Sequence, residues 1–234
     1  MSSPTPPVVR VLAWDLPTRM AKWLLVILVG LAFISHRYGD ITQVWHQWNG
    51  IAILVVILFR LFWGVVGGST ARFTGFLSGP RAMITYASCL VRRKPQHFLG
   101  HNPLGGWMVI ALLVAVAVQA LYGLFTTDDN GGMASGPLVD RVSEATASTA
   151  SVWHQNIATV VLILVGLHVA ANLLYSLFGR DNLITAMITG RKPELDYVDC
   201  EEATAGSVIR ALLCLFAAAV VVLGGILLAG GSLP

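Results

Sequence analysis

Residues 151–179 read SVWHQNIATVVLILVGLHVAANLLYSLFG, and this stretch decides the fold that the sequence predicts. It contains no charged residue, and a helix of about 20 apolar residues spans the hydrocarbon core of a membrane. Its two histidines, His154 and His168, are 14 positions apart, which is four helical turns less about 40° and about 21 Å along the axis. One membrane-spanning helix is therefore expected to present two imidazoles on the same face, at opposite depths.

Four further apolar stretches have the length of a membrane span, so the chain is expected to cross a membrane five times. The five stretches are Pro17–Ser35, Val44–Gly67, Pro103–Thr127, Val152–Gly179 and Val208–Ala229. The composition agrees, because 56% of the residues are hydrophobic and 12% are charged, about half the charged fraction of a soluble domain. A single soluble core is thereby excluded.

The basic residues set the expected orientation. If the spans alternate from a cytoplasmic N-terminus, all of the 15 Lys and Arg residues except Arg37 and Arg141 lie on the inner side. Loops rich in Lys and Arg remain in the cytoplasm during insertion. The sequence therefore predicts a multi-pass protein of the cytoplasmic membrane. The basic residues lie between apolar runs, so nucleic acid is not an expected partner.

Histidine inside a span is rare, because a polar ring in lipid needs a partner. His46 is expected to open the second helix and His154 the fourth, both near the outer surface, and His168 lies deeper in the fourth. Imidazole binds haem iron, and ligands at two depths of one helix suit two haems, one above the other. The alternative is that the three histidines are hydrogen-bonded packing residues.

His46 and His154 are expected to ligate an outer haem from opposite sides. Gly50, one turn beyond His46, lets the backbone approach a flat macrocycle, although close packing between helices explains such glycines equally well. The cysteines Cys89, Cys200 and Cys214 form no C-x-x-C-H motif, so covalently attached haem is not expected.

Four motifs mark the chain between Val11 and Lys192: WDLPTR (14–19), LFRLFWG (58–64), GHNPLG (100–105), and NL (182–183) with AMITGRK (186–192). On these motifs the chain resembles the prokaryotic cytochrome b561 and nickel-iron hydrogenase cytochrome b family. The resemblance implies a bacterial inner-membrane bundle of four helices with two b haems. Histidines opening helices two and four hold one haem, matching His46 and His154. Histidines near the inner ends of helices one and four hold the other.

The inner site departs from the family pattern, because Lys22 stands where the first helix is expected to carry a histidine, whereas His168 keeps its place. A lysine amine binds iron only when it is deprotonated. Three outcomes follow: ligation by Lys22 and His168, a five-coordinate haem on His168, or no inner haem with Lys22 snorkelling to the interface. Arg60 is either the partner of a haem propionate or an interfacial anchor.

The sequence thus predicts an all-α protein. A transmembrane four-helix haem-binding domain (11–192) is followed by a cytoplasmic linker (193–207) and an additional, peripheral transmembrane helix (208–230). The expected cofactors are one haem b at the outer site, a second one depending on Lys22, and quinone.

The expected function is one-electron transfer between the quinone pool and a redox partner at the outer face, such as a cytochrome c or another redox subunit. The outer loop suits a cationic partner, because it carries Asp128, Asp129, Asp140 and Glu144. We expect an electron carrier rather than a stand-alone enzyme. A quinone-linked oxidoreductase subunit remains open, as does a structural or docking subunit without the inner haem. A homodimer and a hetero-complex are both compatible with the sequence.

Overall fold

The computed structural model describes residues 9–37, 39–92, 96–127, 135–178 and 183–234. In these residues five helices are long and apolar enough to cross a membrane, as predicted. They are α1 (Leu16–Arg37), α2 (Gly39–Val66), α5 (Pro103–Gly123), α6 (Glu144–Phe178) and α8 (Val208–Leu228). The protein is therefore an all-α, multi-pass membrane protein.

The shorter elements lie in the connections between these helices. They are α3 (Phe73–Phe76), α4 (Pro80–Val91), a 3₁₀ turn (Val139–Arg141), α7 (Leu183–Thr189) and the strands β1 (Arg10–Leu12) and β2 (Arg191–Pro193). Proline at the first position of α4 and of α5 suits a helix start, because the missing N–H has no partner there.

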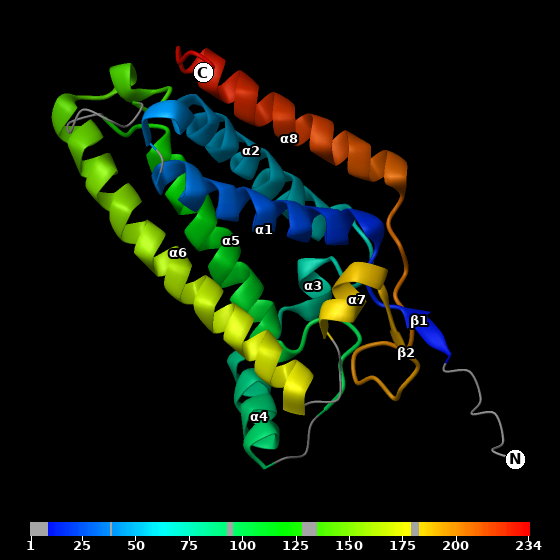
Figure 1. Ribbon diagram of the computed structural model, residues 1–234. Helices are drawn as coiled ribbons and strands as arrows, with labels where there is room; N and C mark the ends of the chain where they lie inside the picture. Colours follow the sequence, from blue (N-terminus) through cyan, green and yellow to red (C-terminus); the bar gives the residue numbers. More distant parts are fainter. Residues whose placement is uncertain (1–8, 38, 93–95, 128–134, 179–182) are drawn as a thin grey trace, which may run out of the picture.

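Helix α2 is the centre of the bundle. It packs against α1, α5 and α8, whereas α6 packs against α5 (Figure 1). In the most apolar segment of α2, 56% of the residues are buried inside the protein, compared with 6% in α6. The core between α2, α5 and α6 consists of aliphatic side chains such as Ile57, Leu113 and Val161.

Helices α1 and α6 do not pack closely on one another within the described residues. The four helices therefore form the row α1, α2, α5, α6 rather than a closed ring. Apolar side chains along both outer members of the row stay exposed in the isolated chain, including Leu31 on α1 and Leu167 on α6. In a membrane, lipid or a bound apolar group must cover these faces.

Segments from three distant parts of the chain close one end of the bundle. Strand β1 pairs antiparallel with β2, with Val11 opposite Lys192. The backbone N–H groups of Leu99 and Gly100 donate to the carboxylate of Asp199 at 2.7 and 2.8 Å. We call β1, β2, α3, α7 and the loops that join them the cap.

The remaining connections between the long helices lie at the opposite end of the bundle. The Gln47 side chain donates to the carbonyl of Ser135 at 2.7 Å, and Nε of Arg141 donates to the carbonyl of Gly230 at 3.0 Å. Successive connections therefore alternate between the two ends, which confirms the predicted alternation of spans. The residues Asp128 and Asp129 lie outside the described residues.

Asp15 links α1, α2 and the approach to α8. Its side chain is 5% exposed, and its oxygens accept from the N–H groups of Thr18, Gly68, Gly206 and the Trp63 indole. A buried carboxylate is stable only when such donors replace water. A Cβ at position 68 would lie 2.5 Å from an Asp15 oxygen, so glycine is required for this close approach.

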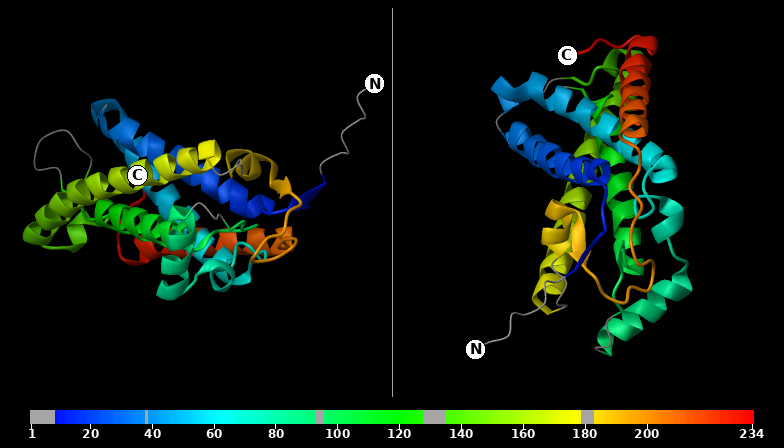
Figure 2. Two further views of the ribbon diagram at one scale, coloured as in Figure 1. Left: turned by 90° about the horizontal axis from the view of Figure 1, so that it is seen from below. Right: turned by 90° about the vertical axis from the view of Figure 1, so that its right-hand side faces the viewer.

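Helix α8, predicted as an additional helix outside the four-helix domain, lies along α2 (Figure 2). Its small residues Ala211 and Ala218 are buried against Phe59 and Trp63 of α2. The Arg210 side chain donates to the carbonyl of Val66 at 3.3 Å, and Arg141 holds the other end. Helix α8 therefore forms part of the core around α2.

Two helix starts also differ from the expected ones. Helix α6 begins at Glu144 rather than at Val152, because Ser143 and the Ala- and Thr-rich residues after it form further helical turns, and the Ser143 hydroxyl accepts from the Thr146 N–H at 3.3 Å. Helix α2 begins at Gly39. His46 and His154 therefore do not open their helices but lie about two to three turns inside them.

Replacing Asp15 by alanine should destabilise the fold. The change leaves buried backbone and indole N–H groups without acceptors, which costs about 1–3 kcal/mol for each such group. The thermal unfolding of the purified protein in detergent, followed by circular dichroism, should shift to lower temperature.

Asp196→Ala is the matched control, because Asp196 is an exposed carboxylate that follows β2, at the same end of the bundle as Asp15. Equal unfolding temperatures for the two variants would contradict the role of Asp15.

Candidate functional site

The structure brings His46 of α2 and His154 of α6 together. Their ring centroids are 6.3 Å apart, and the ring planes are inclined by 82°. Two imidazoles that bind one metal from opposite sides, with metal–nitrogen bonds of about 2 Å, have ring centres about 6 Å apart. The separation of the two rings therefore fits one iron atom between them.

Hydrogen bonds at Nδ1 orient both rings. The His154 Nδ1–H donates to the carbonyl of Gln119 at 2.9 Å. The His46 Nδ1 lies 2.9 Å from the hydroxyl of Ser35, which itself donates to the carbonyl of Ala32 at 3.1 Å and so accepts from the imidazole. With the proton on Nδ1, the lone pair of each neutral ring lies on Nε2, the nitrogen required for a metal bond.

Glycines give these rings room. A Cβ at Gly123 would lie 3.0 Å from Cε1 of His154, so the approach of α5 to this imidazole depends on glycine. A Cβ at Gly50 would meet no protein atom within 4 Å. Gly50 lies one turn beyond His46 and therefore borders space that the protein's own side chains do not fill.

At the end of the bundle near the cap, His168 lies on α6 and Lys22 on α1. The Asn172 side chain donates to the carbonyl of His168 at 2.7 Å and lies 3.2 Å from its Nε2. The Lys22 ammonium lies 3.2 Å from the Met187 sulfur and 3.8 Å from the centre of the Trp14 ring. The lysine therefore extends beneath the cap and is partly buried.

Arg60 is 2% exposed, so it does not act as a water-exposed interfacial anchor. Its guanidinium carbon lies 5.0 Å from the Phe73 ring and 5.9 Å from the Phe76 ring. Within the described residues, its two terminal nitrogens are buried without a hydrogen-bond partner. Buried guanidinium groups need acceptors, and the described residues provide none to these two nitrogens.

His101 belongs to the GHNPLG motif and directly precedes Asn102, the N-cap of α5. Its ring lies 4.6 Å from Trp14 and 4.5 Å from Phe76, and its two nitrogens are buried with no partner among the described residues. Burial lowers the pKa of His101 well below its usual range, and the nearby charges of Lys22 and Arg60 lower it further. The imidazole is therefore neutral, with one donor and one acceptor nitrogen.

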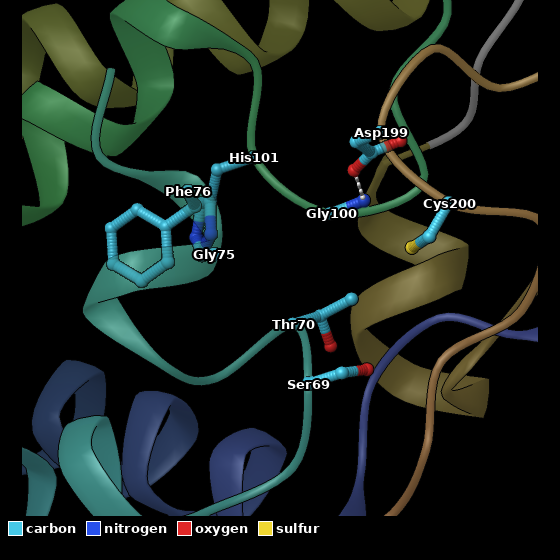
Figure 3. A pocket seen from close by; sticks show the side chains of 8 residues that line it. All are labelled: Ser69, Thr70, Gly75, Phe76, Gly100, His101, Asp199 and Cys200. Carbon is cyan, nitrogen blue, oxygen red and sulfur yellow. Dashed lines mark hydrogen bonds between the residues drawn. The ribbon is translucent and has the colours of Figure 1, made fainter. Parts of the chain in front are cut away.

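A cavity of about 150 Å³ borders His101 on the side of the cap (Figure 3). Its lining residues come from the α2–α3 connection, from α3, from the segment before α5, and from the loop after β2; they are Ser69, Thr70, Gly75, Phe76, Gly100, His101, Asp199 and Cys200. Burial raises the pKa of the Cys200 thiol, as does the neighbouring Asp199. The cavity therefore combines hydroxyl groups with a neutral imidazole, a protonated thiol and the carboxylate of Asp199.

Gly123→Ala should weaken the outer site, because the added methyl group would displace the His154 ring. Less haem should remain per chain after purification, as measured by the pyridine haemochrome spectrum. Gly225→Ala on α8 is the matched control, since its Cβ would meet nothing within 4 Å. Equal haem content in both variants would show that the position of this ring is not critical.

Comparison with known proteins agrees with this geometry. No curated protein sequence matches the chain significantly. The profile of a family described as prokaryotic cytochrome b561 matches residues 13–190, which is well over half of the chain and includes α1, α2, α5 and α6. The protein therefore belongs to the prokaryotic cytochrome b561 family.

Proposed function

We propose that this membrane b-type cytochrome transfers single electrons between quinone and a redox partner at the outer face, using a haem b held by His46 and His154. Family membership supports electron transfer by a haem-binding membrane protein. The distance of 6.3 Å between the two imidazole rings is the observation that carries the choice of ligands.

A bound haem would supply an iron atom able to change its oxidation state by one electron, and His46 and His154 would hold it. The protein's own residues do the rest. Ser35 and the Gln119 carbonyl hold the two rings in the tautomer that bonds iron through Nε2. Gly50 leaves open space one turn beyond His46, and Gly123 leaves room for the His154 ring.

Charge distribution supports the proposed orientation, with the cap in the cytoplasm of a bacterial inner membrane. Arg10, Arg19, Arg72 and Arg191 are in or next to the cap, as the excess of basic residues in cytoplasmic loops requires. At the opposite end Asp140 and Glu144 are exposed, and their charges suit a cationic redox protein such as a cytochrome c.

The inner position is proposed to depend on His168. The contacts of Lys22 with Met187 and Trp14 favour the arrangement in which its ammonium group stays beneath the cap and does not ligate iron. An inner haem would then be five-coordinate on His168, or the position would hold no haem.

The second candidate function is that of a structural or docking subunit in a larger membrane complex. The same contacts of Lys22 favour it, because a chain without an inner haem has no continuous route for electrons across the membrane. A protein that binds no haem would favour the docking function, since a docking subunit does not require the outer haem.

Replacing His46 or His154 by alanine should abolish the main b-type absorption band, because each variant leaves the outer iron with one protein ligand. Absorption spectra and the haem content of the purified protein provide the measurement. His97→Ala is the control, since His97 lies in the connection before α5, away from the pair. Full haem content in both variants would rule out the proposed ligands.

Lys22→His should add haem to each chain, because it restores an imidazole opposite His168. Lys22→Met should leave the wild-type haem content unchanged if the lysine does not ligate iron. The ratio of haem to protein and the low-spin absorption bands test both variants. A loss of haem in Lys22→Met would instead identify Lys22 as a ligand.

A further inference from the structure

Arg60 and His101 differ from Asp15 and Lys192, two other buried polar residues near the cap. Asp15 accepts several hydrogen bonds, and the Lys192 ammonium donates to the carbonyl of Phe98 at 2.8 Å. By contrast, the terminal nitrogens of Arg60 and both ring nitrogens of His101 are buried with no partner in the described part of the chain. Donors in this state are costly unless an acceptor from another molecule reaches them.

The two side chains share one aromatic neighbour. The Arg60 guanidinium lies 5.9 Å from the centre of the Phe76 ring, and the His101 ring lies 4.5 Å from it. Arg60 comes from α2, Phe76 from α3, and His101 from the residue before the N-cap of α5. Three elements thus converge on a small region in which the aromatic rings offer no strong acceptor.

The local charge is positive. Lys22, Arg60 and Lys192 all act electrostatically on His101, and the only buried carboxylate among the described core residues is that of Asp15. The oxygens of Asp15 already accept from backbone and indole N–H groups. An acceptor that satisfies Arg60 should therefore carry negative charge.

We propose that Arg60 and His101 together bind a carboxylate group beside Phe76. The guanidinium offers two parallel N–H donors to the two oxygens, and the neutral imidazole adds a third donor. A metal ion would not fit, because a guanidinium is a donor only and repels cations.

The carboxylate has two sources with the same chemistry. The first is a propionate of a haem at the inner position, and this source rests on the proposed function. The second is a free carboxylate from the aqueous side, entering through the cavity of Figure 3, which His101 and Phe76 line.

The test compares the wild-type protein with Arg60→Met and His101→Phe, which keep the size of the side chain and remove its donors. Arg72→Met and His97→Phe are the controls, because they remove a similar group outside the proposed site. If either test variant fails to fold, Arg60→Lys and His101→Gln take its place, since each keeps fewer or differently placed donors.

Two readouts distinguish the sources. A redox titration of the haem absorbance reports a bound propionate. Arg60→Met should then lower the midpoint potential of the haem beside Arg60 and leave that of the outer haem unchanged. The reason is that loss of a nearby cation disfavours the reduced form. Thermal unfolding with increasing sodium succinate, against sodium chloride of equal ionic strength, reports a free carboxylate: succinate should stabilise the wild type and both controls, but neither test variant.

A shift in potential without stabilisation by succinate assigns the site to a propionate, and the reverse result assigns it to a free carboxylate. If the test variants match their controls in both readouts, the proposal is wrong, while an intact outer haem leaves the proposed function standing. A wild-type protein without haem would overturn the proposed function, and the succinate measurement would still decide the carboxylate site.

Discussion

The carboxylate of Asp15 fixes the geometry on which the rest of the bundle depends. It accepts hydrogen bonds from the first turn of α1, from the Trp63 indole near the end of α2, and from the turn after α2. It also accepts one from Gly206, which precedes the N-cap of α8. Hydrocarbon provides no hydrogen-bond partners, so polar groups that join the spans must bond to one another. With α1 and α8 held against α2 at the cap, α1 and α6 are the two outer members of the row and do not pack closely on one another within the described residues.

The sequence predicted the spans well, because lipid imposes a direct requirement for length and apolarity on each of them. It did not predict where α6 begins, since residues 143–151 are too polar to resemble a span and become helical through Ser143 and the continuity of the helix. The pairing of β1 with β2 was also missed. Each strand has three residues, and their pairing depends on the cap that brings the two ends of the family domain together.

For the candidate site, the sequence indicated that His46 and His154 face each other, and the structure places their rings at a suitable distance. The sequence could not indicate that Ser35 and the carbonyl of Gln119 orient them, because these contacts link separate helices. His101 was underestimated for a related reason. Its significance comes from burial between Trp14 and Phe76, which are far from it in the chain.

The packing of α8 on α2 has a consequence for biogenesis. Helix α8 is synthesised after α6, yet its neighbour is the second span of the chain. During translation, lipid or the insertion machinery must therefore cover the face of α2 that carries Phe59 and Trp63. This face packs against Ala211 and Ala218 only after α8 has been synthesised. All residues proposed to contact haem are in place by then. Loading of the cofactor and completion of the helix bundle are therefore separable steps in the maturation of this cytochrome.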